Sequence, residues 1–387
     1  MITNLSAHLL LLISTSAFLA PPTPSPQAST PNPTQLHALA IADFAGELLE
    51  TFDELNLGVD SDPRGDGLKS IREGLLSIVG KVINPLIDSI KSELVPLIRA
   101  LENSATIPAG SVKTTATGGS KLTVVQHPSI SALQIAIPVY SKALTRYTAS
   151  ATSQASLASL LISVLWRGLV ALSNRPQPPP SPPASPAIVP AVSKTQRQFA
   201  TTPPVSPPSA RFAIKLPPSR PPSPPSTQVP STAAADARAL YDLLSHLPRP
   251  VAAHRLAREA VDEAYDGLKA LAQLLEVAQA NSFTKNKQAE VDYVKELEEL
   301  TADLPTLIAL PVVLRAHSPT SSDIASMIGL SEQDYRSGCL HGFSRAEECA
   351  GAVGQRVLDV LATDITASGS SWVATKWLEH KISAADD

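Results

Sequence analysis

Apolar residues recur at three- and four-residue spacing over two long stretches of the chain, 36–173 and 236–383. This spacing places them on one face of an α-helix, so both stretches are predicted to be helical. In the first stretch, the longest apolar stripe contains Ile71, Leu75, Ile78, Val82, Leu86, Ile90, Leu94, Leu97 and Leu101. Pro85 and Pro96 interrupt it. Because proline removes a backbone donor and clashes with the preceding turn, we expect two or three shorter helices there.

The rest of the first stretch holds further helical patterns. One precedes the long stripe, from Ile41 to Leu55, and another runs from Ile130 to Tyr147. Residues 155–173 are apolar on most sides, which favours a buried central helix over a membrane segment. Residues 104–120 predict a loop. Leu122 to Val125 could be extended, but the sequence offers this short run no partner strand.

The second stretch is helical throughout. Because aromatic residues make up only 4% of the whole chain, the cores of both stretches are expected to consist mainly of Leu, Ile, Val and Ala. The pattern predicts helices over 261–278 and 291–300, a helix start at Asp303–Leu304–Pro305, and shorter helices over 321–329, 331–340, 344–363 and 370–381.

Proline is concentrated in two segments that lack helical patterning. Of 36 prolines, six lie between Pro21 and Pro33 and nineteen between Pro176 and Pro230. Such tracts bury too little apolar surface to offset the backbone entropy lost on ordering. The predicted fold is therefore all-α. It has two helical-bundle domains (36–173 and 236–383), a long Pro/Ser-rich disordered linker (174–235) and a disordered N-terminal segment (1–35). The pattern leaves open whether the two helical units pack together.

Charge divides along the same boundaries. The linker has no Asp or Glu but has six basic residues: Arg175, Lys194, Arg197, Arg211, Lys215 and Arg220. Since the whole chain carries a net charge of −4, the remainder carries −10. An acidic body gives no general attraction to nucleic acid, so we expect protein partners.

One linker motif fits a known mode of peptide recognition. Lys215, Pro218 and Pro221 follow the pattern basic-x-x-Pro-x-x-Pro. SH3 domains accept this pattern because a preformed polyproline II helix binds with little ordering cost. We therefore predict an SH3-type partner.

The linker also contains repeated Ser-Pro and Thr-Pro pairs, which are typical of proline-directed kinase substrates. Each phosphate would add roughly −1.5 to −2 charges, so three or four would neutralise the linker. The candidate phosphorylation sites are Ser181, Ser185, Thr202, Ser206 and Ser223.

No pattern for catalysis or for metal or cofactor binding is found. Cys339, His341, Cys349 and His380 lack the paired spacing of zinc sites. The two cysteines are ten residues apart in one predicted helical stretch, about 15 Å along a helix axis, so we expect reduced, buried thiols. Since the chain also lacks a nucleophile elbow and a glycine-rich nucleotide loop, we predict no enzyme, no cofactor and no metal. The leading hypothesis is a non-catalytic scaffold or adaptor.

Two other functions stay open. The apolar run at 5–20 resembles a secretory signal, which would make this a secreted or cell-surface protein. No Lys or Arg precedes that run, so a cytoplasmic or nuclear location is favoured. Residues 322–338 resemble a helix-turn-helix, as in a transcriptional regulator, although Glu332 and Asp334 would repel phosphate there. Helix capping also explains that pattern, with Gly329 ending one helix and Ser331 starting the next.

Overall fold

The computed structural model describes residues 33–59, 66–104, 124–176, 229–279, 289–317, 323–364 and 372–386. Before the linker, its elements are α2 (Pro33–Glu54), α3 (Asp66–Arg99), the 3-10 turn η2 (Ala100–Glu102), β1 (Val124–Val125), α4 (Pro128–Tyr147) and α5 (Ala151–Asn174). After it come β2 (Val229–Pro230), α6 (Ala233–Leu244), α7 (Arg255–Gln279), α8 (Ala289–Leu300), α9 (Thr306–His317), α10 (Ile324–Met327), α11 (Glu332–Gly338), α12 (Phe343–Asp364) and α13 (Trp372–Asp386). The all-α class, with helical units on both sides of the linker, is confirmed. Most of the two segments predicted to be disordered, 1–35 and 174–235, lies outside the described residues, namely 1–32 and 177–228. Their remaining residues, 33–35, 174–176 and 229–235, are described and belong to the helical body, so the segments predicted to be disordered extend too far at these ends.

Helix α3 continues through both of its prolines, so the expectation of shorter helices is wrong. Pro85 and Pro96 lie inside the helix and are exposed. Each costs about 3 kcal/mol within a helix. Each buried aliphatic side chain contributes about 1.5–3 kcal/mol, and burial of the opposite face therefore outweighs both prolines. The buried residues of that face are Ile78, Val79, Val82, Ile83, Leu86, Ile87, Ile90, Leu94 and Ile98.

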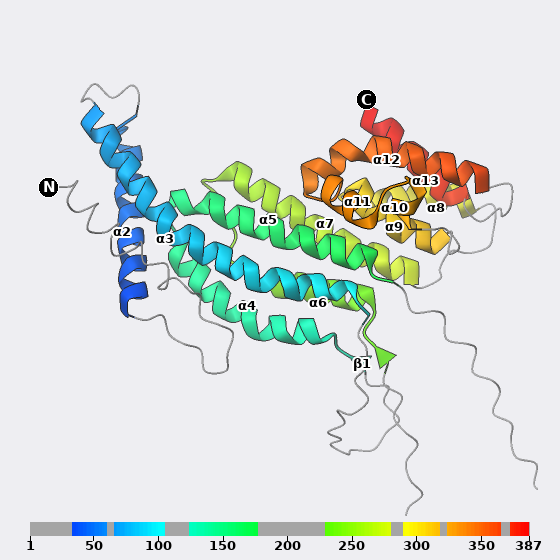
Figure 1. The fold of residues 1–387 in the computed structure, drawn as a ribbon, viewed down its shortest axis with the longest axis horizontal. Helices are drawn as coiled ribbons and strands as arrows, with labels where there is room; N and C mark the ends of the chain where they lie inside the picture. Colours follow the sequence, from blue (N-terminus) through cyan, green and yellow to red (C-terminus); the bar gives the residue numbers. More distant parts are fainter. Residues whose placement is uncertain are drawn as a thin grey trace, which may run out of the picture.

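Helix α5 lies at the centre of the molecule, as its apolar composition predicts. The long helices α3, α4, α5 and α7 run side by side, and helices α8 to α13 gather at one end (Figure 1). Helix α5 contacts α3, α7 and α9. Among the described residues it is the one helix long and apolar enough to cross a membrane, and 67% of its apolar window is buried against the other helices.

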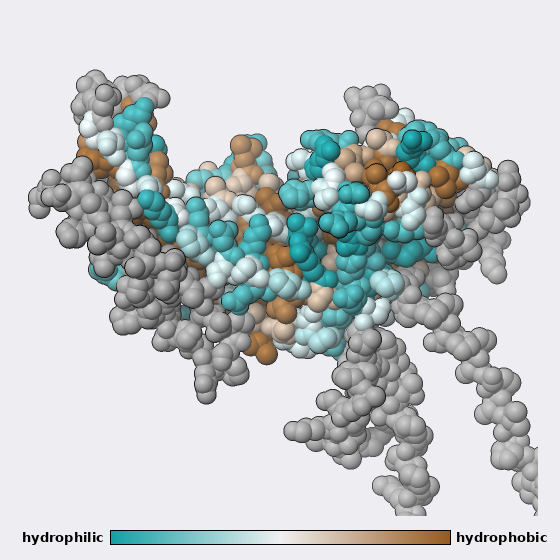
Figure 2. All heavy atoms as spheres, viewed as in Figure 1, coloured by the Kyte–Doolittle hydropathy of each residue, from teal (hydrophilic) through white to brown (hydrophobic). Residues whose placement is uncertain are grey.

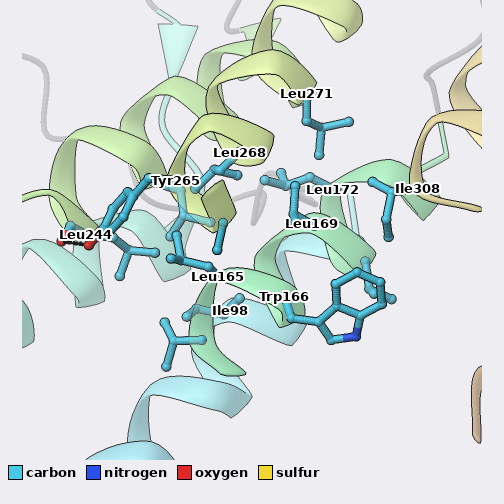
Figure 3. Packing of buried hydrophobic residues seen from close by; sticks show 14 of the residues in the cluster. Ile98, Leu165, Trp166, Leu169, Leu172, Leu244, Tyr265, Leu268, Leu271 and Ile308 are labelled. Carbon is cyan, nitrogen blue, oxygen red and sulfur yellow. Dashed lines mark hydrogen bonds between the residues drawn. The ribbon is translucent and has the colours of Figure 1, made fainter. Parts of the chain in front are cut away.

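The helical units on the two sides of the linker share one hydrophobic core. Leu165, Leu169 and Leu172 of α5 lie between Ile98 of α3 on one side and the α7 residues Leu268 and Leu271 on the other (Figure 3). Since α3 and α5 precede the linker and α7 follows it, the two units are packed together. This answers the question that the sequence leaves open.

Polar contacts also join the two units. The indole N–H of Trp166 donates to the carbonyl of Leu340 at 2.9 Å. The amide N–H of Val251 donates to the side-chain oxygen of Gln154 at 2.9 Å. Since a buried Trp N–H needs an acceptor, the first contact fixes how the C-terminal helices sit against α5.

The short run at Val124–Val125 does have a partner strand. It pairs in parallel with Val229–Pro230, which lies on the far side of the linker. The sequence expectation of an unpaired run is therefore wrong. Its partner is separated from it by about one hundred residues, and a two-residue strand gives no sequence signal of its own.

The C-terminal helices agree with their sequence prediction. Gly329 has a φ of 75° after α10, a left-handed conformation that glycine adopts without strain. The hydroxyl of Ser331 accepts from the amide N–H of Asp334 at 3.1 Å and starts α11. The predicted capping is thus confirmed at both residues.

Candidate functional site at the base of the proline-rich segment

The site residues predicted from the sequence all belong to one segment, 177–228, which lies outside the described residues. The structure does describe the base of this segment, where the chain leaves the helical body at Pro176 and returns at Val229. The predicted residues in question are Lys215, Pro218 and Pro221 of the SH3-type motif, and Ser181, Ser185, Thr202, Ser206 and Ser223 of the phosphorylation sites.

A buried ion pair holds the two ends of this segment together. The guanidinium of Arg175 pairs with the carboxylate of Asp236, and both side chains are at most 4% exposed. Arg175 also donates to the carbonyl of Ser231 at 3.2 Å, and the Ser231 hydroxyl donates to Asp236 at 2.9 Å. A charge removed from water requires partners of this kind. We call Arg175, Ser231, Asp236 and the neighbouring His127 the polar clamp.

His127 links the clamp to Asn103, which lies just before segment 105–123. The Nδ1 atom of His127 accepts from the amide N–H of Ser129 at 3.2 Å, so its Nε2 atom is free to donate to the carbonyl of Asn103 at 3.2 Å. Burial is the main cause that lowers its pKa; Asp236 acts in the opposite direction and Arg175 in the same one. A neutral imidazole keeps Nδ1 as an acceptor, so the lowered pKa favours this arrangement.

The clamp changes the interpretation of the linker. Pro176 and Val229 lie at one place on the body, because Arg175 contacts Ser231 and because β2 pairs with β1. The hydroxyl of Ser104 adds a contact to the carbonyl of Pro176 at 3.4 Å. The two ends of segment 177–228, which we call the loop, therefore lie at one place on the body. Arg175, which the sequence counts with the basic linker, is a buried residue of the body.

The two cysteines lie near each other, contrary to the sequence expectation. The chain reverses between α11 and α12, and the Cys349 thiol lies 3.9 Å from the carbonyl oxygen of Gly338, the residue before Cys339. Burial is the main cause that raises the pKa of the Cys339 thiol to about 11, and a hydrogen bond to Cys349 adds to the effect. Both thiols are free, with Cys339 buried and Cys349 half-buried.

The residues of the considered metal cluster do not assemble. His380 pairs with Glu298 of α8, whereas His341 is exposed in the turn before α12. Within the described ranges, no group of three His, Cys, Asp or Glu side chains could hold a metal ion.

The segment that resembles a helix-turn-helix is short in the structure. Helix α10 has four residues and α11 has seven. Arg336 of α11 is bound to Glu102 of η2, so this face of α11 packs on the body. The remaining surface of α11 carries exposed carboxylates, Glu332 and Asp334, which do not favour DNA phosphates.

The sequence alone could not have predicted the clamp. Arg175 follows a long apolar helix and precedes a proline tract, which is typical of a solvated linker residue. Asp236 lies 61 positions further on, in the first turn of α6.

Comparison of the whole chain with protein-family models, with curated proteins and with solved structures finds no match.

Proposed function

We propose that this chain is a non-catalytic scaffold or adaptor, in which a helical body holds a basic, proline-rich loop out to protein partners. One observation supports this proposal above all: the buried Arg175–Asp236 pair anchors both ends of the loop at one place. Burying an ion pair carries a desolvation penalty that can exceed the attraction between the two charges. We therefore infer that this pair serves to fix the relative position of the two chain segments. With both ends of the loop anchored in this way, the SH3-type motif and the Ser-Pro sites of the loop would be accessible to partner proteins.

The closed base suits the recognition of linear motifs. A proline-rich segment already populates the polyproline II conformation, so a partner domain has little ordering cost to overcome. Proline-directed kinases are the second class of partner that we propose. The loop carries five basic residues besides Arg175, and three phosphates would offset them. Phosphorylation would thus switch the loop from a basic to a neutral or acidic ligand.

The SH3-type motif predicts a specific loss of binding. We expect at least one member of a panel of purified SH3 domains to bind the full-length chain. The triple variant Lys215→Ala, Pro218→Ala, Pro221→Ala should weaken this binding at least about tenfold, because it removes the charge and both prolines that fill the groove. Titration by fluorescence anisotropy or calorimetry measures the change.

The chain itself offers a matched control. Pro204 and Pro207 form a Pro-x-x-Pro pattern with no basic residue at the required position. The double variant Pro204→Ala, Pro207→Ala should therefore bind as the wild type does. Equal loss in both variants would indicate a general effect of proline content and would rule out this motif.

A further inference from the structure

Two adjoining hollows form a groove between α3, α5 and the turn that joins α11 to α12. Their volumes are about 570 and 650 Å3, and Arg99, Arg167 and His341 line both. Lys91 lines the larger one. We call these four residues the arginine groove. In the space-filling view, hydrophilic residues gather where α3 and α5 meet the C-terminal helices (Figure 2).

The wall that closes the groove is firmly held. Trp166 donates to the carbonyl of Leu340 at 2.9 Å, and its ring lies 4.6 Å from that of Phe343. At the rim, Arg336 donates with two nitrogens to the carboxylate of Glu102, one contact being 2.8 Å. His341 lies between Leu340 and Phe343, so its backbone is anchored on both sides. The groove is therefore formed before any ligand arrives.

The cations of the groove have no anionic partner. Within the described part of the chain, the side chains of Arg99, Arg167 and Lys91 have no hydrogen bond or ion pair. Glu102, which lines the smaller hollow, is already occupied by both terminal nitrogens of Arg336. Burial lowers the pKa of Arg167, and the like charge of Arg99 lowers it further. Two guanidinium groups that line the same hollows repel each other unless an anion lies between them.

The two neighbouring segments, 105–123 and 177–228, have no acidic side chain that could supply this anion. Residues 105–123 and 177–228 begin at Ser104 and Pro176, which are in contact at this end of the body. Neither segment contains an Asp or a Glu. An anion for this groove must therefore be a separate molecule, or it must be added to the chain after synthesis.

We propose that the arginine groove binds a phosphate monoester, with Arg99 and Arg167 as its two principal ligands. A dianionic phosphate neutralises two guanidinium groups, whereas a carboxylate neutralises one. Its three oxygens also match the paired donors of arginine. Lys91 and His341 border the same space and would add donors. This inference depends on the geometry of the groove and holds whether or not the loop binds SH3 domains.

Nucleic acid fits the groove less well than a single phosphate group does. Because residues 177–228 hold five basic residues and no acidic one, the rest of the chain has a net charge of −9. Glu332 and Asp334 are exposed on α11, next to the wall of the groove. A polyanion would have to pass these carboxylates. A phosphate monoester would contact only the local cluster of cations.

Titration with O-phosphoserine tests the site directly. Calorimetry with the full-length chain at fixed ionic strength, with serine as the blank, should give saturable binding at one site. Arg99→Gln and Arg167→Gln should each weaken it at least about tenfold, because each removes a charge-assisted hydrogen-bond donor. Arg356→Gln, an exposed arginine of α12, makes the same charge change outside the groove and should leave binding unchanged.

Thermal unfolding separates binding from folding. Removal of one of two repelling charges should leave the Tm of Arg99→Gln unchanged or raise it. Since Arg99 is exposed, this variant decides the outcome even if Arg167→Gln does not fold. The proposal is overturned if wild type shows no saturable binding, if Arg99→Gln binds as tightly as wild type, or if the chain takes up duplex DNA but not phosphoserine.

A second arm of the experiment identifies the source of the phosphate. The full-length chain is first treated with a proline-directed kinase and then titrated with phosphoserine. Loss of binding that Ser181→Ala and Ser185→Ala together restore would show that the loop supplies the phosphate in the same chain. Unchanged binding would show that another molecule supplies it. Both results support the site.

Discussion

Arg175→Ala should lower the free energy of unfolding by about 3–5 kcal/mol. The substitution leaves the carboxylate of Asp236 buried without a counter-ion, at 2% exposure of its side chain, and breaking one side of a buried pair typically costs this much. It also removes the contact to the carbonyl of Ser231, so the base of the loop should open. Urea denaturation followed by circular dichroism measures the loss.

Two further variants show whether burial is the cause. Arg238→Ala removes an ion pair with Glu276 in which the arginine is 61% exposed, and it should cost less than about 1 kcal/mol. The double variant Arg175→Met, Asp236→Leu removes both charges together and should recover most of the stability lost in Arg175→Ala. If Arg175→Ala and Arg238→Ala lose equal stability, the clamp does not exist as described.

Trp166→Ala should cost about 3–5 kcal/mol, the range for deleting a large buried aromatic side chain. Trp166 is 2% exposed and joins α5 to the turn at Leu340 and Phe343. Its loss creates a cavity and leaves the carbonyl of Leu340 without a donor. Chemical denaturation gives the total cost, and amide hydrogen exchange should show the fastest new exchange in α11 and the start of α12.

The conservative change and a matched tryptophan serve as controls. Trp166→Phe keeps an aromatic ring in the site but loses the hydrogen bond and part of the packing, so a cost of about 1–3 kcal/mol, below that of Trp166→Ala, is expected. Trp372→Ala deletes a tryptophan that is 37% exposed and should cost clearly less than Trp166→Ala. Similar losses in Trp166→Ala and Trp372→Ala would contradict the placement of Trp166 between the two units.

Periodicity predicted the helices well because burial decides them. From Ile78 to Leu94, every residue of the predicted apolar stripe is buried in the structure. The same stripe explains why the prediction of shorter helices at Pro85 and Pro96 is wrong. The prediction considered only the free energy that a proline costs within a helix, whereas packing of the face opposite to both prolines stabilises α3 as one helix.

The contacts between distant residues could not be predicted from one sequence. Arg175 and Asp236 come together because β2 returns to β1, and a two-residue strand leaves no pattern. The arginine groove needs Arg99 and Arg167 from neighbouring helices and a turn from beyond the linker. Each arginine taken alone is typical of a solvated helix face.

The cysteine pair shows how a small boundary error changes the chemistry. The helical pattern predicts one helical stretch through Cys339 and Cys349, which would keep the two thiols far apart. The structure ends α11 at Gly338 and starts α12 at Phe343, and the intervening turn reverses the chain. Four residues in the turn are enough to bring the two thiols near each other.

A single cut within residues 177–228 tests most directly whether the helices on both sides of the linker form one body. A recognition sequence for a specific protease is inserted between Gln198 and Phe199, and the folded full-length chain is cleaved. The shared core predicts that both fragments co-elute in size-exclusion chromatography with light scattering, at a mass close to the 40.7 kDa of the intact chain, and separate only in denaturant. Two folded fragments that elute independently would contradict the shared core, and with it the closed loop.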